Sequence, residues 1–309
     1  MSSPPPTSSN GGGGSNGGEG HLPPRTRRVR SFLRPLLDQK HHHAKAKWLN
    51  LDALVLTWNV HAKLPKDPND INEVLETKDG KQVDMYVIAL QEVVDLNPFN
   101  VAIRPHHAAI PWENIIEAAI EREQRYAKVC VKQLVGILLL VYVRHSLFPF
   151  ISEIQTDSLG LGVVRLGNKG AVMFRMKLFG SDIVILNTHL APHQRNVVKR
   201  DKNYLDIVSN VCYIDNDFNV RSIFDADLLI WAGDLNYRLD YPIEDVQKVV
   251  SMIEGSMMEG SREFSSLCAH DQLTVSRNTT RAFDDLCEGK IDFAPTYKVT
   301  QDNPSLHIR

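Results

Sequence analysis

The chain has 309 residues, of which 43% are hydrophobic and 23% are charged, and its formal net charge is −2 at pH 7. These values are typical of a soluble globular protein with a sizeable core, best organised as one large domain, and the small net charge identifies no class of partner. The most apolar run, Leu134–Val143, is far shorter than the roughly 20 residues of a membrane-spanning helix, which argues against an integral membrane protein.

Residues 1–47 differ in composition from the rest of the chain. They begin with a tract of Ser, Pro, Gly and Asn that has too little apolar surface to offset the entropy of ordering, so we predict disorder. A cluster of Arg and Lys follows over residues 25–47. It is either a peripheral contact with an anionic membrane, at roughly 1 kcal/mol per basic residue, or a solvated linker. Four cysteines without a Cys-x-x-Cys pair and without a leader pattern predict reduced thiols in a cytoplasmic protein.

From Trp48 onward the pattern changes to short apolar runs that alternate with helical periodicity. Runs rich in Val, Ile and Leu predict buried strands at Ala53–Val60, Met85–Leu90, Val135–Val143, Ala171–Leu178, Ile183–Leu190 and Asp227–Trp231. Apolar residues at helical spacing predict helices after Pro111 and over about Val197–Val211, Ile243–Ile253 and Arg262–Leu273. Strands and helices in this order indicate an α/β fold.

Four of the predicted strands end in polar residues. Asn59 stands near the end of the first run, Glu92 follows the second, and His189 stands near the end of the fifth. Asp234 and Asn236 lie on a tight turn after the last run. An acid beside a neutral amide provides a proton acceptor and a positioning group. We therefore expect these strand ends to converge on one polar cleft.

Two further motifs, Gly167-Asn-Lys-Gly170 and Pro295-Thr-Tyr-Lys298, follow the same order along the chain. Together with the strand ends, from about Trp48 to Lys298, they strongly resemble the inositol polyphosphate 5-phosphatases of the deoxyribonuclease-I-like endonuclease/exonuclease/phosphatase superfamily. The resemblance implies a four-layer α/β/β/α sandwich of two mixed sheets. It also implies that residues 48–309 form the catalytic domain, incomplete at the C-terminus and without its last strands.

The resemblance implies a Mg²⁺-dependent hydrolase that removes the 5-phosphate from phosphoinositides such as phosphatidylinositol 4,5-bisphosphate, or from soluble inositol polyphosphates. Hydrolysis of a phosphate monoester needs charge neutralisation and an oriented water. Metal binding is implied for Asn59 and Glu92, whose hard oxygens suit Mg²⁺. Catalytic roles are implied for His189 at the scissile phosphate, for Asp234 at the attacking water, and for Asn236 beside water and phosphate.

The two short motifs carry the implied contacts to substrate. Asn168 and Lys169 lie on a turn whose flanking glycines allow close backbone approach to a phosphate. Tyr297 and Lys298 match a clamp on the phosphate beside the scissile one, usually the 4-phosphate. The implied partner is thus a phosphoinositide head group or an inositol polyphosphate, and no nucleic acid is expected.

The sequence departs from the family pattern in two places. The usual Arg-Asn-x-Asp-Tyr reads Arg200-Asp-Lys-Asn-Tyr204, and after Lys298 the family's Trp-Cys-Asp-Arg and Ser-Asp-His motifs do not follow. The Ser-Asp-His motif carries a positioned histidine in the family. We therefore expect turnover by this chain to be slower, by at least about 10²-fold, than that of a chain with the motif. A catalytically inactive phosphoinositide-binding or regulatory fragment is therefore an alternative. A nuclease or sphingomyelinase of the superfamily is a third, which Lys169 and Tyr297 disfavour.

Overall fold

The computed structural model describes residues 50–65, 69–75, 83–95, 109–120, 126–162, 167–255, 264–291, 293 and 295. The predictions made for residues 1–47 and for Tyr297 and Lys298 lie outside these ranges. Within the described part, no helix has both the length and the apolar character needed to cross a membrane.

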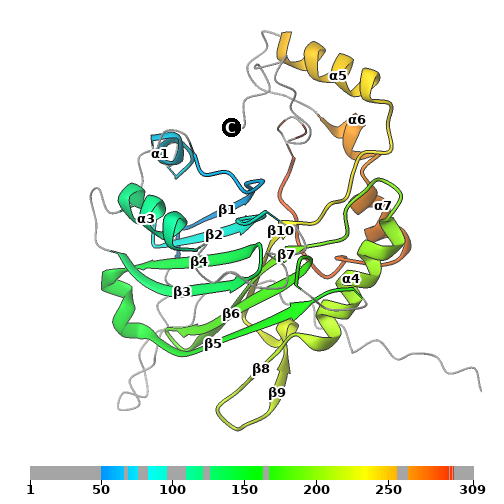
Figure 1. Ribbon diagram of the computed structural model, residues 1–309. Coiled ribbons are helices and arrows are strands. Elements are labelled where there is room, and N and C mark those ends of the chain that lie inside the picture. Colours follow the sequence, from blue (N-terminus) through cyan, green and yellow to red (C-terminus); the bar gives the residue numbers. More distant parts are fainter. Residues whose placement is uncertain are drawn as a thin grey trace, which may run out of the picture.

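Two four-stranded sheets pack face to face (Figure 1). The first sheet has the order β1-β2-β4-β3 and the second has the order β10-β7-β6-β5. In each sheet one parallel pair, β1 with β2 or β10 with β7, is extended by antiparallel strands, so both sheets are mixed. The first sheet comprises β1 (Ala53–Asn59), β2 (Met85–Gln91), β3 (Tyr126–Leu134) and β4 (Ile137–Arg144). The second comprises β5 (Ile151–Gly160), β6 (Gly170–Leu178), β7 (Ser181–His189) and β10 (Leu228–Asp234).

The central strands β2 and β4 are apolar along most of their length, up to Gln91 and Arg144 at their ends, because both of their faces are buried. On β2, Val87 and Ala89 face the second sheet, where they join a core that includes Phe174 of β6. Ile88 and Leu90 point the opposite way and pack beneath the outer helices. The alternation of a strand thus divides one continuous apolar run between two separate cores.

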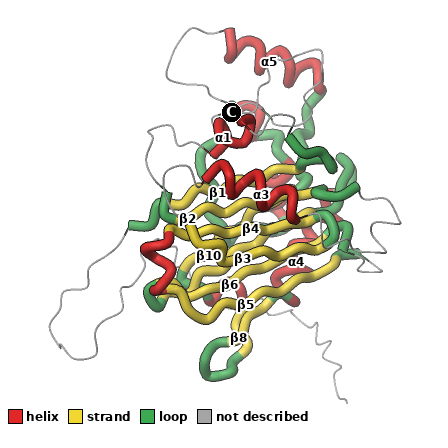
Figure 2. The backbone as a smooth tube through the Cα atoms, turned by 60° about the vertical axis from the view of Figure 1, so that its left-hand side comes forward, coloured by secondary structure: helices red, strands yellow, loops and turns green. Residues whose placement is uncertain are grey.

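Helices cover the outer face of each sheet (Figure 2). Two helices, α1 (Asn69–Leu75) and α3 (Ala109–Ile120), pack on the first sheet. On the second sheet, α4 (Val197–Asn210) contributes Tyr204 and Ile207 to a third core. These layers confirm the predicted four-layer sandwich of two mixed sheets. The remaining elements are η2 (His145–Phe150), β8 (Cys212–Ile214), β9 (Val220–Ser222), η3 (Ile223–Asp225), α5 (Ile243–Gly255), α6 (Ser265–Cys268) and α7 (Gln272–Thr279).

The prediction of one helix over Arg262–Leu273 is wrong, because the described residues there form two helices. Between α6 and α7, Asp271 has extended backbone angles and its carboxylate accepts a hydrogen bond from the Thr274 N–H at 2.9 Å. This is N-capping, and it starts a new helix where apolar periodicity alone suggested continuation. Strands β3 and β5 were not predicted at all, because their partly exposed, polar-rich sequences give no continuous apolar run.

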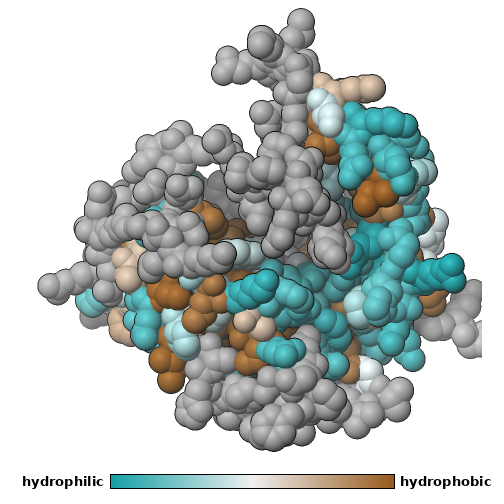
Figure 3. Space-filling model, turned by 45° about the horizontal axis from the view of Figure 1, so that its top comes forward, coloured by the Kyte–Doolittle hydropathy of each residue, from teal (hydrophilic) through white to brown (hydrophobic). Residues whose placement is uncertain are grey.

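Polar and apolar residues of the described part are distributed unevenly over the face shown in Figure 3. On the face shown in Figure 3, the hydrophilic residues of the described part gather on the right, with hydrophobic residues in small patches among them. Elsewhere, β8 and β9 form a hairpin that projects from the body and carries Phe218 at an exposed position (Figure 1). This hairpin precedes β10, so it lies at the opposite end of that strand from Asp234.

Candidate active site

The carboxyl ends of both parallel pairs meet at one end of the sandwich. In the first sheet Asn59 pairs with Gln91, and Glu92 follows directly. In the second sheet Asp234 pairs with His189. Since β1 packs against β10 across the sandwich, these four strand ends come together. The register of two separate sheets therefore builds one site.

Direct contacts join the two sheets at this point. Asn59 Nδ2 donates a hydrogen bond to Asp234 Oδ2 at 3.0 Å. His189 Nε2 lies 3.3 Å from Asp234 Oδ2 and 3.7 Å from Glu92 Oε1. The structure thus brings together Asn59, Glu92, His189 and Asp234, which sequence analysis selected from distant segments.

Glycine is required at the end of β10, directly before Asp234. Gly233 has φ +135°, and a Cβ at this position would lie 2.1 Å from the carbonyl oxygen of Thr188 on β7. The absence of a side chain therefore lets β10 pair closely with β7. Two residues later, Asn236 has φ +59° and its backbone N–H donates to Asp234 Oδ1 at 3.0 Å. This backbone hydrogen bond fixes the carboxylate.

The side-chain amide of Asn236 is buried and engaged within the chain. Its Nδ2 donates to the carbonyl oxygen of Leu190 at 3.1 Å, and its Oδ1 accepts from Arg238 Nη2 at 2.9 Å. Asn236 therefore ties the segment after β10 to the segment after β7. Its contact with Asp234 is made by the backbone.

Lys169 brings a positive charge into the cluster. Its Nζ lies 2.7 Å from His189 Nε2 and 3.9 Å from Glu92 Oε1. Burial lowers the pKa of Lys169, while the charges of Glu92 and Asp234 oppose that shift. By contrast, the side chain of Asn168 is exposed, and its Oδ1 accepts a hydrogen bond from the backbone N–H of Lys169 at 3.0 Å.

The two carboxylates of the cluster remain ionised near neutral pH. Burial favours a raised pKa for Glu92, but hydrogen bonds from Asn59 and His61 and the electrostatic influence of His189 and Lys169 outweigh it and lower the pKa. Burial acts the same way on Asp234, yet His189, Asn59 and the backbone of Asn236 lower the pKa of Asp234 to about 2. The site therefore pairs stable anions with cationic groups.

Hard oxygen donors are present, but the metal set is partial. In the described part of the chain, no group of three or more His, Cys, Asp or Glu side chains is arranged to hold a metal ion. Mg²⁺ is commonly bound by one or two carboxylates and completed by water and substrate phosphate. An ionised Glu92 next to the amide of Asn59 fits that pattern, and a phosphorylated substrate would complete it.

A buried polar pair lies beneath the site, and sequence analysis assigned no role to one of its members, Gln91. Gln91 Nε2 donates to Asn187 Oδ1 at 2.7 Å. Asn187 Nδ2 in turn donates to the carbonyl oxygens of Leu90 and Leu138 at 3.0 and 2.8 Å. Polar side chains inside otherwise apolar strands were the available signal, since a buried amide needs partners. This pair joins β2 to β7 immediately behind Glu92 and His189.

A second group of buried polar residues supports the segments that leave β7 and β10. Arg200 is fully buried; its Nη1 donates to the carbonyl oxygen of His193 at 2.8 Å and its Nη2 to Gln272 Oε1 at 2.6 Å. The same Gln272 oxygen accepts from the backbone N–H of Arg238 at 3.0 Å. Helices α4 and α7 therefore hold both segments in fixed positions.

The neighbours of Arg200 on α4 extend this network. Asp201 Oδ1 accepts from the Tyr237 hydroxyl at 2.6 Å, and its Oδ2 accepts from the Thr280 hydroxyl at 2.9 Å. Asn203 Oδ1 accepts from the backbone N–H of Ala191 at 3.1 Å. Both residues that depart from the family pattern are thus hydrogen-bond acceptors in the network.

Comparisons with known proteins identify relatives of the chain. The family described as "Endonuclease/Exonuclease/phosphatase family 2" matches residues 56–306. A Type II inositol 1,4,5-trisphosphate 5-phosphatase of Mus musculus is 33% identical over 81% of this chain, which covers 24% of the mouse protein. A Type IV inositol polyphosphate 5-phosphatase 9 of Arabidopsis thaliana is 30% identical over 84% of this chain and 66% of its own length. The chain thus spans about a quarter of the first of these relatives.

Among solved structures, the inositol polyphosphate 5-phosphatase domain of SPsynaptojanin, in complex with inositol (1,4)-bisphosphate and a calcium ion, is similar. Its TM-score is 0.65 at 26% identity, over 81% of this chain and 69% of that domain.

Proposed function

The chain belongs to the Endonuclease/Exonuclease/phosphatase family 2, and on this premise we propose that it is a Mg²⁺-dependent phosphomonoester hydrolase. Its substrates would be phosphoinositides such as phosphatidylinositol 4,5-bisphosphate or soluble inositol polyphosphates, from which it removes the 5-phosphate. The names of its relatives support this substrate class. So does the inositol bisphosphate bound by the similar solved domain.

One observation carries the proposal. Glu92, Lys169, His189 and Asp234 come from four separate strand ends or turns, and their charged groups lie within 4 Å of His189 Nε2. Burying ionisable groups this close together costs free energy of folding. Such clusters are typical of catalytic sites.

The residues divide the work of hydrolysis between the phosphate and the water. Lys169 and His189 would donate to oxygens of the scissile phosphate and stabilise the charge that develops there. Asp234, held by Asn59 and by the backbone of Asn236, would orient and deprotonate the attacking water. The water oxygen then bonds to phosphorus as the bond from phosphorus to the inositol oxygen breaks. The inositol oxygen takes up a proton from solvent, and Asp234 releases to solvent the proton that it accepted from the water.

A divalent ion held by Glu92 and Asn59 would supply further neutralisation of the phosphate. In the structure, Asn59 Nδ2 already contacts Asp234 and its Oδ1 accepts from the His61 N–H at 3.1 Å. We therefore propose that Glu92 provides the main negative charge that binds the ion and that Asn59 provides a supporting contact.

Substrate recognition would draw on both short motifs. Lys169 reaches into the cluster while its neighbour Asn168 is exposed, and we propose that Tyr297 and Lys298 bind the 4-phosphate. Lys298→Ala should then weaken substrates that carry a 4-phosphate more than those that lack it, because the charge meets that group and not the reacting one. Equal losses on both kinds of substrate would remove the clamp assignment.

We further propose that the basic segment 25–47 brings the protein to the cytosolic face of an anionic membrane. This electrostatic contact should weaken as salt screens it. Sedimentation with vesicles that contain phosphatidylserine, with and without residues 1–47, measures it. Equal binding of both forms at low salt would make the segment a linker.

The central test is Mg²⁺-dependent release of phosphate from phosphatidylinositol 4,5-bisphosphate by the full chain. Asp234→Ala should lower the rate by at least about 10²-fold because it removes the water-orienting base. Asp217→Ala is a matched control, since Asp217 is an exposed acid on the hairpin of β8 and β9. Binding of the substrate without any release of phosphate would favour the inactive, phosphoinositide-binding alternative instead.

A further inference from the structure

His61 lies beside the proposed metal ligand, and its side chain has no part in the proposed steps of hydrolysis. It follows β1, and its side chain is 81% exposed. Even so, its ring Nδ1 lies 3.2 Å from Glu92 Oε2. An exposed side chain contributes little to a core, so packing does not explain why this ring meets the carboxylate.

The backbone around this contact is held in an unusual conformation. His61, Ala62 and Glu92 have φ values of 48°, 53° and 54°, in the left-handed region that residues other than glycine seldom adopt. The Ala62 N–H donates to the carbonyl oxygen of Glu92 at 2.6 Å, which binds the turn after β1 to the end of β2. Strain of this kind persists only where surrounding contacts impose it, and it gathers at functional sites.

The two oxygens of Glu92 consequently have different surroundings. Oε2 faces His61 on the solvent side, while Oε1 faces His189 and Lys169 inside the cluster, at 3.7 and 3.9 Å. A carboxylate that is hydrogen-bonded at one oxygen cannot rotate freely, so the orientation of its other oxygen is fixed.

We propose that His61 is a positioning residue for Glu92. By donating from Nδ1 to Oε2, His61 holds Glu92 so that Oε1 is presented to a divalent cation in the cluster. The proposal rests on the proposed function, because it takes Glu92 as the metal ligand. His61 itself is not a ligand here, since Mg²⁺ prefers oxygen and the ring nitrogen nearest the cluster is occupied by Glu92.

Two substitutions separate this role from a merely structural one. His61→Asn keeps an N–H donor at the position of Nδ1, and Asn tolerates left-handed backbone angles. His61→Phe keeps the ring but removes the donor. Binding of Mn²⁺, an oxygen-preferring stand-in, is measured on the full chain by electron paramagnetic resonance. His61→Phe should weaken it by about tenfold, the low end of the range for partners of metal ligands, and His61→Asn by no more than about twofold.

Glu92→Gln provides the reference for this experiment. It should weaken Mn²⁺ binding itself, and adding His61→Phe to it should cause no further loss, because the two residues act through one contact. The Mg²⁺ concentration for half-maximal phosphate release should rise in His61→Phe, while its rate at saturating Mg²⁺ stays close to that of the unchanged chain.

The possible results distinguish the two proposals. If Glu92→Gln weakens Mn²⁺ binding and His61→Phe does not, the role of His61 is overturned and the metal assignment stands. If Glu92→Gln binds Mn²⁺ as the unchanged chain does, the metal assignment falls, and the role of His61 falls with it. Equal losses in His61→Asn and His61→Phe would also overturn the role, because the donor would then not matter.

Discussion

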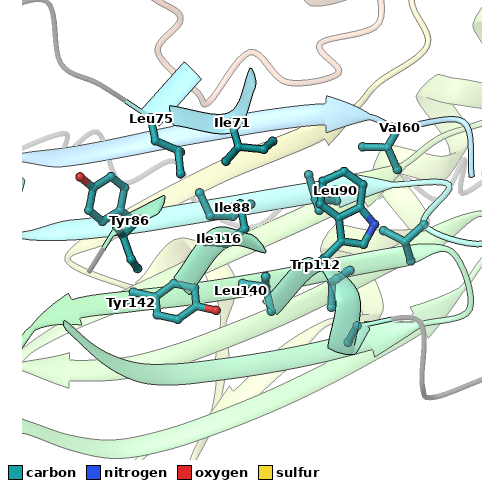
Figure 4. Close-up of a cluster of buried hydrophobic side chains, with 14 of the residues drawn as sticks. Val60, Ile71, Leu75, Tyr86, Ile88, Leu90, Trp112, Ile116, Leu140 and Tyr142 are labelled. Atoms are coloured by element: carbon teal, nitrogen blue, oxygen red, sulfur yellow. The ribbon is translucent and has the colours of Figure 1, made fainter. Parts of the chain in front are cut away.

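The two outer faces of the sandwich are covered by helices in different ways. On the first sheet, α1 and α3 pack through apolar side chains such as Ile71, Trp112 and Ile116 (Figure 4). On the second sheet, α4 and α7 bring buried polar residues as well, among them Arg200 and Gln272. Apolar contacts are non-directional, whereas hydrogen bonds fix distance and angle. The first face therefore serves stability, and the second also holds the site.

The position of the polar face explains the difference. The carbonyl oxygens and N–H groups that it holds belong to segments that begin directly after His189 and Asp234. On the first sheet, the strand ends are instead fixed by the turn after β1 and by the Gln91–Asn187 pair. Helices α1 and α3 are thus not needed to position the strand ends at the site.

The largest loss of stability is expected from the apolar face. Ile116→Ala removes a fully buried side chain from the middle of α3 and should cost about 2–5 kcal/mol in the free energy of unfolding. Urea denaturation measures this cost, with Ile116→Val as a milder control. Because no hydrogen bond to the site is lost, the rate of phosphate release per folded molecule should stay within about twofold. A large loss of rate in fully folded protein would break the distinction between the faces.

A smaller loss of stability but a larger loss of function is expected from the polar face. Arg200→Met keeps much of the side-chain volume but removes the charged donor from Gln272 Oε1 and from the carbonyl oxygen of His193, at about 1–3 kcal/mol. Each of these oxygens keeps one backbone N–H donor, from Arg238 and Asn196 respectively. Since both segments after β7 and β10 lose an anchor, phosphate release should fall by about tenfold or more. The control is Lys199→Met on the exposed side of the same helix. An unchanged rate would show that this network only stabilises.

The family pattern at Asp201 and Asn203 tests the network more finely. Asn203→Asp keeps an oxygen for the Ala191 N–H but adds a second buried carboxylate to a helix that already buries Asp201, so it should cost about 1–2 kcal/mol. Exchanging both residues, Asp201→Asn with Asn203→Asp, restores the original number of charges. The pair should therefore be more stable than Asn203→Asp alone. Simple additivity of the two single losses in urea denaturation would contradict this compensation.

The smallest expected effect is on the reactivity of a thiol in the layer between the sheets, and it involves no loss of stability. Burial raises the pKa of Cys130 to about 12, so its thiol should resist labelling by iodoacetamide at pH 8. Cys287 is exposed and should react quickly. Mass spectrometry after a short exposure distinguishes them. Faster labelling of Cys130 in Ile116→Ala than in Arg200→Met would agree with the apolar face being the main source of stability.

Much of this architecture can be predicted from local patterns in the sequence. Apolar runs predicted β2, β6 and β7, and the polar residues at strand ends predicted which side chains meet, because carboxyl ends of parallel strands share one edge. The roles of these residues remain proposals. His61 and Gln272 were assigned no part in the site, since their partners are 31 and 72 residues away in sequence and only the packed fold brings them close.

The bond between Asn59 and Asp234 has a consequence for folding kinetics. These residues are 175 positions apart, and they meet only when the two sheets dock, whereas the hairpins of β3 with β4 and of β6 with β7 close short loops. Closing long loops is entropically slow, so the hairpins should form first and the docking of β1 against β10 late. After dilution from urea, secondary structure seen by circular dichroism should return before enzymatic activity. Recovery of activity at the proposed site would then report the rate of the last step of folding.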